Sequence, residues 1–120
     1  MEYQNKINLY GDFVKATGNL YEGIILSHLY DRAKSESSTA SSVNVVVTNV
    51  PQLKKDCFLE KFSDNLIRQR INALLRDLWI ERTSLAGIEK TNRRAFRVDT
   101  GKIDKRIKEF KEKEFRNKFY

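Results

Sequence analysis

The stretch from Ser63 to Leu78 constrains the fold of this chain more than any other segment. Ser63 can cap a helix, because its hydroxyl accepts a hydrogen bond from an unpaired amide of the first turn, and Asp64 complements the positive end of the helix dipole. At 3.6 residues per turn, apolar side chains then share one side: Ile67, Ile71, Leu74, Leu75 and Leu78. We therefore expect a helix over 63–78 that packs one side against a core.

The opposite side of this predicted helix has an unusual composition. It carries only amides and arginines: Asn65, Arg68, Gln69, Asn72 and Arg76. Such side chains can read base edges or hold phosphates, and no carboxylate interrupts them. The stripe is therefore compatible with a helix presented to nucleic acid. An ordinary amphipathic helix with a solvated face remains the alternative.

An N-terminal arm and a first predicted helix begin the chain. Residues 1–18 form an N-terminal arm to which we assign no specific structure, since Gly11 and Gly18 interrupt its apolar residues. Asn19 followed by Glu22 resembles a capping box, and it opens a helix over 20–34. This helix is apolar on most sides, which is typical of the middle of a small core.

Three further segments connect that helix to the one at 63–78. The polar, serine-rich run 35–42 has the composition of a flexible loop. The β-branched run 43–48 predicts a strand. Asn49, with Pro51 in the first turn, can open a short helix that ends around Phe58.

A basic hairpin is expected after the 63–78 helix. Residues 79–85 read as one strand, Gly87 can take the positive φ of a turn, and 94–99 alternate as the returning strand. The tip and return carry a cluster of polar and basic residues: Lys90, Asn92, Arg93, Arg94 and Arg97. This cluster could lie along a phosphate backbone or enter a minor groove, or it could be a solvated loop.

The last segment, from Thr100 to Tyr120, is helical in pattern. Its first apolar stripe contains Ile103, Ile107 and Phe110, but Glu114 stands where that stripe should continue. Apolar residues then follow on a different side: Phe115, Phe119 and Tyr120. A single domain does not need two apolar faces on its final helix, so we infer that these three residues, within a helix over 102–120, contact a second subunit in a homodimer.

The net charge of +7 is segregated along the chain. Residues 1–62 are neutral overall, whereas 63–101 contribute +3 and 102–120 contribute +4. Clustered cations gain free energy when they displace counterions from phosphate, so the basic half suggests a surface that meets a polyanion.

Several classes of function find no support in the sequence. The single cysteine, Cys57, cannot form an internal disulfide or supply a zinc cluster, and the lone His28 is read as a packed core residue. There is no glycine-rich phosphate loop and no nucleophile with a visible base, so we expect no enzyme, catalytic residue, metal or cofactor. The size fits a single domain over 1–120, and no apolar run is long enough for a membrane span. A cytoplasmic protein is expected.

The order of these elements resembles a winged helix-turn-helix domain. The 63–78 stretch resembles the recognition-helix pattern of MarR-like regulators and of the N-terminal domains of phage and plasmid replication initiators. The matching residues are Ser63, Ile67, Ile71, Leu74, Trp79 and Ile80. The sequence departs from the pattern at Leu66, where Thr is usual, at Gln69, where Arg is frequent, and at Leu78, where Gly is usual.

The resemblance implies an α+β, mostly helical fold with a small antiparallel β-hairpin wing and a C-terminal helix. It also implies sequence-specific binding to double-stranded DNA, commonly as a homodimer, in a phage- or plasmid-type regulator of replication or transcription. The recognition helix 63–78 would read bases through Asn65, Arg68, Gln69 and Asn72. Phosphate or minor-groove contacts, most of them from the wing at 86–97, would come from Arg76, Lys90, Arg93, Arg94 and Arg97.

Two other functions remain as alternatives. In the first, the chain is a winged-helix domain that serves solely as a protein-interaction module, such as an inhibitor or a replisome adaptor, and does not bind DNA. Charge alone does not separate that function from DNA binding. RNA binding is a third reading, but the chain lacks the exposed aromatic platform that such modules usually display.

Overall fold

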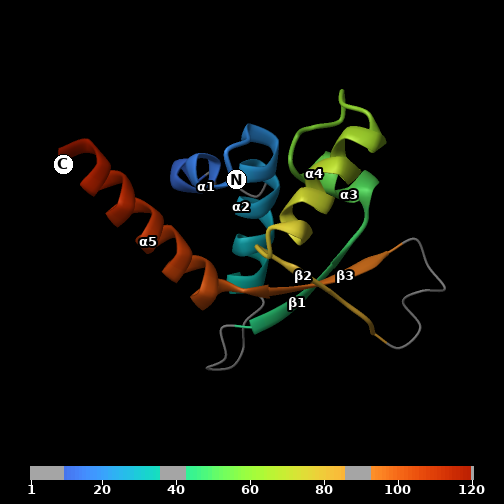
Figure 1. The fold of residues 1–120 in the computed structure, drawn as a ribbon. Coiled ribbons are helices and arrows are strands. Elements are labelled where there is room, and N and C mark those ends of the chain that lie inside the picture. Colours follow the sequence, from blue (N-terminus) through green and yellow to red (C-terminus); the bar gives the residue numbers. More distant parts are fainter. Residues whose placement is uncertain (1–9, 36–42, 86–92, 120) are drawn as a thin grey trace, which may run out of the picture.

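The computed structural model describes residues 10–35, 43–85 and 93–119, with the backbone alone at 118 and 119. The elements in chain order are α1 (Gly11–Thr17), α2 (Leu20–Ser35), β1 (Val43–Thr48), α3 (Val50–Asp56), α4 (Asp64–Arg76), β2 (Glu81–Thr83), β3 (Arg94–Asp99) and α5 (Thr100–Phe119) (Figure 1). The described chain is therefore α+β and mostly helical, as the sequence predicts at this level.

The three strands form one antiparallel sheet in the order β1-β3-β2. Val46 of β1 and Arg82 of β2 both lie opposite Phe96 of the central strand β3. Because side chains alternate between the two faces of a sheet, Val46, Phe96 and Val98 share one face, and all three are buried. The helices cover this face, and α5 runs outward from the end of β3 (Figure 1).

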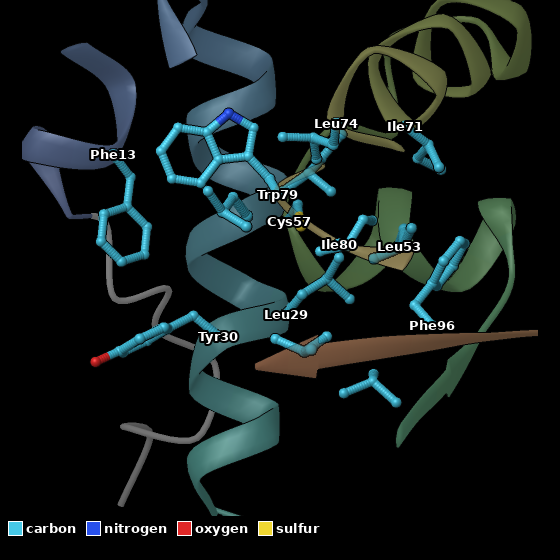
Figure 2. Packing of buried hydrophobic residues seen from close by; sticks show 14 of the residues in the cluster. Phe13, Leu29, Tyr30, Leu53, Cys57, Ile71, Leu74, Trp79, Ile80 and Phe96 are labelled. Atoms are coloured by element: carbon cyan, nitrogen blue, oxygen red, sulfur yellow. The ribbon is translucent and has the colours of Figure 1, made fainter. Parts of the chain in front are cut away.

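Helix α2 lies at the centre of the core, as expected for a helix that is apolar on most sides. Ile25, Leu26 and Leu29 have no exposed surface. Figure 2 shows Phe13 and Tyr30 on one side of α2, whereas Phe96 lies on the other side with residues from α3 and α4. One continuous apolar cluster thus joins α1, α2, the sheet and the α3–α4 pair.

Side-chain caps mark the beginnings of α2, α3 and α4, as the sequence predicts. The Asn19 carboxamide oxygen accepts hydrogen bonds from the amides of Tyr21 and Glu22, at 2.9 and 3.1 Å. Asn49 Oδ1 accepts from the Gln52 amide at 2.7 Å, and Ser63 Oγ accepts from the amide at position 66 at 3.1 Å. These bonds satisfy amides that have no partner within the helix.

The end of α4 differs from the prediction. The helix ends at Arg76 rather than Leu78, and Leu78 is 58% exposed instead of lying on the buried side. The amides of Leu78 and Trp79 donate to the carbonyls of Leu75 and Leu74, at 3.1 and 2.9 Å, which is the pattern of a Schellman motif. That motif needs a left-handed residue, and Leu78 supplies it with φ 62°; the Trp79 side chain that follows is buried.

Other boundaries also shift. Residues 11–17 of the N-terminal arm form α1, a helix that the sequence does not predict. The short helix α3 ends at Asp56, and Phe58 follows it with a positive φ of 57°. Strand β2 covers only 81–83, the residues that pair with β3, and the buried residues Trp79 and Ile80 precede it. Ser35, predicted to begin the flexible loop 35–42, is instead the last residue of α2, and the rest of that loop and the Gly87 turn lie outside the described residues.

Candidate nucleic-acid interface

Helix α4 places its amide and arginine stripe on the surface. Asn65, Arg68, Gln69 and Asn72 are all exposed. The opposite side of the helix carries Ile67, Ile71 and Leu74, which are at most 1% exposed. The structure therefore brings the four base-reading candidates together on one accessible helix face.

Carboxylates lie only at the two ends of α4. At the start, the Asp64 carboxylate lies 2.9 Å from Lys54 Nζ of α3, and this hydrogen bond lowers the pKa of Asp64. At the end, Asp77 lies beyond the last helical residue. Arg68, in the middle, forms no ion pair with any residue that the structure describes. Asp64, one turn before Arg68 on the same helix, is paired with Lys54, so Arg68 supplies the positive charge at the central part of the face.

Arg76, the last member of the predicted stripe, is partly neutralised. Its Nε lies 3.1 Å from Asp77 Oδ1, and a second guanidinium nitrogen lies 3.3 Å from Oδ2. The hydrogen bond from Arg76 lowers the pKa of the Asp77 carboxyl. The Arg76 side chain is 73% exposed, so it can reach a phosphate, but Asp77 competes for the same guanidinium.

Arg70 has a role that the sequence did not reveal. Its Nη1 lies 2.8 Å from Glu22 Oε2 of α2, and the Glu22 side chain is only 6% exposed. This ion pair fixes the middle of α4 to the central helix of the core. The signal in the sequence was the position of Arg70 three residues after the buried Ile67, which turns it toward the core instead of toward solvent.

The basic residues of the hairpin do not share one face. Arg97 pairs in register with Glu81, and its guanidinium lies 4.0 Å from that carboxylate. By alternation, Arg82 and Arg94 lie on the opposite face, the one covered by the helices. Arg94 is half-buried and Arg82 is exposed. The exposed Arg82 was not among the sequence candidates, although it sits in the strand that forms one arm of the hairpin.

The remaining predicted contacts are only partly visible. Arg93 is exposed and immediately precedes β3, whereas Lys90 lies outside the described residues with the rest of the hairpin tip. On α5, Phe115 is 61% exposed, and the stripe on the other side is buried at Ile103 and Ile107. The side chain of Phe119 and the whole of Tyr120 lie outside the described part.

Neither His28 nor Cys57 belongs to a reactive cluster. His28 Nε2 lies 3.4 Å from Asp56 Oδ2 without the geometry of a hydrogen bond, and burial lowers the pKa of His28. Cys57 is 2% exposed, and burial raises the pKa of its thiol to about 12. The described residues contain no group of three side chains that could hold a metal ion.

The chain matches no family model, no curated protein and no solved structure. The resemblance to winged-helix proteins therefore rests on the residues and the order of elements given above. In the part of the chain that the structure describes, no helix combines the length and the apolar character that crossing a membrane requires.

Proposed function

We propose that this chain is a winged helix-turn-helix domain that binds double-stranded DNA sequence-specifically. Helix α4 is the recognition helix, and the β2–β3 hairpin is the wing. The observation that carries the proposal is the exposed α4 face, on which Asn65, Arg68, Gln69 and Asn72 stand without an intervening carboxylate. In duplex DNA, amides pair with adenine edges and arginines pair with guanine edges in the major groove.

The arrangement of the elements supports this proposal. The order α2, β1, α3, α4, β2, β3 is the order in which a winged-helix domain presents its helices, recognition helix and wing. Both α3 and α4 begin with a side-chain cap, and residues 57–63 join them. The Arg70–Glu22 ion pair holds α4 against the core, so its outer face can enter a groove as a rigid unit.

The wing candidates divide into two groups. Arg82 and Arg94 lie on the helix-covered face of the hairpin, and Arg93 immediately precedes β3. We assign phosphate contacts to these three. Arg97 is on the far face beside Glu81, and Arg76 is held by Asp77, so their contributions are smaller.

The proposal includes a homodimer formed through α5, which exposes Phe115. A dimer would present two recognition helices to paired half-sites, which is how helix-turn-helix proteins commonly gain specificity. The biological role that fits this domain is the regulation of replication or transcription in a phage or plasmid.

A duplex-binding assay at two salt concentrations tests the proposal. With about four phosphate contacts, affinity should fall roughly 100-fold between about 50 and 200 mM salt, because each contact releases condensed counterions. Absence of binding by the native chain at the lower salt would contradict DNA binding. In that outcome the winged-helix protein-interaction module becomes the better description, and a protein partner should then resist displacement by duplex DNA.

A further inference from the structure

Helix α5 exposes a regular seam of residues along one side. The exposed positions 101, 105, 108, 112 and 115 follow one another at intervals of four, three, four and three. This spacing is that of a coiled-coil contact line. The residues are Gly101, Lys105, Lys108, Glu112 and Phe115. The seam does not coincide with the buried stripe of α5, which holds Ile103 and Ile107.

The charges of α5 are arranged symmetrically about Phe110. Between 104 and 116, every pair of charged residues at equal distance from Phe110 has opposite signs. The pairs are Glu109 with Lys111, Lys108 with Glu112, Arg106 with Glu114, and Asp104 with Arg116. A helix with this pattern is complementary to an antiparallel copy of itself, because residues at equal distances from the centre then lie at the same level.

Charges near the body of the protomer have partners inside it. Asp104 accepts a hydrogen bond from the Tyr30 hydroxyl at 2.6 Å, and Lys111 Nζ lies 3.4 Å from a carboxylate oxygen of Asp12 in α1. The Arg106 guanidinium lies 3.6 Å from the Trp79 ring centroid and donates to the carbonyl of residue 77 at 3.0 Å. Asp104, Arg106 and Lys111 thus have partners within one chain and do not require a second copy.

The seam charges are different. Lys108 and Glu112 stand four residues apart on the same helix, yet they form no ion pair with each other or with another described residue. Lys105 likewise has no ion pair among the described residues, and all three are exposed. These three seam charges are therefore unmatched within the described part of the protomer, as are the off-seam charges Glu109, Lys113, Glu114 and Arg116, so the seam is singled out by its mirror-related signs about Phe110.

We propose that the α5 seam pairs antiparallel with the same seam of a second copy, around a two-fold axis level with Phe110. Lys108 then faces Glu112 of the second copy, and the symmetric contact repeats the pair. Lys105 lies level with Phe115 of the second copy, where its aliphatic stem and ammonium can cover the exposed ring. A parallel pairing would instead oppose Lys108 to Lys108 and Lys105 to Lys105. The inference rests on the homodimer of the proposed function and specifies its contact.

Cysteine cross-linking tests the register. One variant carries Lys108→Cys and another carries Glu112→Cys, and both keep the native Cys57, which is buried and does not interfere. On mixing under mild oxidation, a disulfide should form between the two variants. Each variant alone should stay reduced, because identical positions are then offset by four residues, about 6 Å along the helix, in addition to the separation of the helices. Self-linking of either variant, or no link in the mixture, would overturn the proposed register.

Charge reversal tests the ion pairs by sedimentation at about 1–100 μM protein. Lys108→Glu and Glu112→Lys should each weaken the dimer at least about tenfold, since like charges then oppose each other across the axis. The double variant should restore dimerisation, and the control Lys113→Glu, off the seam, should sediment like the native chain. A native chain that stays at 14.1 kDa over the whole range would overturn the dimer. Retained DNA binding in that case would leave the DNA-binding proposal intact.

Discussion

Helices α4 and α5 both bury one side and expose the other, but their exposed sides carry different chemistry. The centre of the α4 face holds amides and Arg68, and the acids Asp64 and Asp77 flank its two ends. The exposed half of α5, from Lys108 to Arg116, interleaves basic residues with Glu. A face of one sign is complementary to a polyanion, whereas a face of alternating sign is complementary to another alternating face.

This difference explains why net charge alone is a poor guide to the partner. The segment 102–120 has a larger excess of cations than 63–101, yet its acids are interleaved with them. Counterion release depends on cations that approach phosphates together, and nearby carboxylates oppose that approach. We therefore assign DNA to α4 and the hairpin, and a second copy to α5.

The largest expected effect is a difference in stability between substitutions on the buried side of α4 and on the exposed side of α5. Leu74→Ala should lower the free energy of unfolding by about 2–5 kcal/mol, because it removes a fully buried side chain and leaves a cavity. Phe115→Ala, the matched control on α5, should change stability by less than about 0.5 kcal/mol at low protein concentration. Urea unfolding measures both. Equal losses would mean that Phe115 is packed within its own protomer.

The next effect separates base reading from phosphate binding. Asn72→Ala should remove about 1–3 kcal/mol of preference for one site while leaving non-specific affinity nearly unchanged. Arg93→Ala should instead weaken binding to all duplexes alike, because a phosphate contact carries no sequence information. Competition assays with the preferred site and a scrambled duplex compare the two. If both variants lost preference equally, the assigned roles would be wrong.

A smaller effect concerns the end of α4. Leu78→Gly should raise the free energy of unfolding by about 0.5–1 kcal/mol, because glycine adopts the left-handed conformation without steric cost and the lost side chain is largely exposed. A substitution to glycine on α5 should have the opposite effect on stability. Lys113→Gly, in the helix interior, should lower the free energy of unfolding by about 1 kcal/mol. Thermal or urea unfolding of both variants checks the contrast. Destabilisation by Leu78→Gly would show that the exposed leucine makes a contact of its own.

The smallest expected effect is a pH dependence of folding stability that arises from His28, which lies beside Asp56 of α3. Burial lowers the pKa of His28 in the folded chain, whereas the unfolded chain keeps a value of about 6.5. Below about pH 6.5 the unfolded state binds more protons, so the contribution is complete above that pH and is lost as pH falls toward the folded pKa. In the His28→Gln variant, the urea unfolding midpoint should change less between about pH 7.5 and 5.5 than in the native chain. An unchanged slope in this variant would assign the dependence to carboxylates instead.

Local signals made much of the fold predictable. Asn19, Asn49 and Ser63 each cap a helix within one residue of its predicted start, β-branched composition located β1, and alternation located β3. Ends were harder to predict, because Phe58 and Leu78 occupy left-handed positions that usually belong to glycine. The residue types Phe and Leu do not predict that conformation. The conformation accompanies hydrogen bonds that close the helix ends, from the amide of residue 59 to the carbonyl of residue 54 and from that of residue 79 to residue 74.

The candidate site was predictable in composition but not in its internal pairing. The helical period placed Asn65, Arg68 and Asn72 on one exposed face. The Arg70–Glu22 contact joins residues 48 positions apart, and the split of the wing arginines between two faces depends on strand register. Neither long-range pairing nor register can be read from local periodicity, so Arg82 was missed.

The salt dependence of DNA binding by matched variants on the two helices tests the central claim most directly. Arg68→Ala should lower affinity and reduce the slope of log K against log salt concentration by up to about one, because one cation leaves the α4 face. Lys113→Ala removes the same charge from α5 and should leave both the affinity and the slope of the native chain unchanged. Equal effects of the two substitutions, or no binding by the native chain at low salt, would contradict the assignment of DNA to α4.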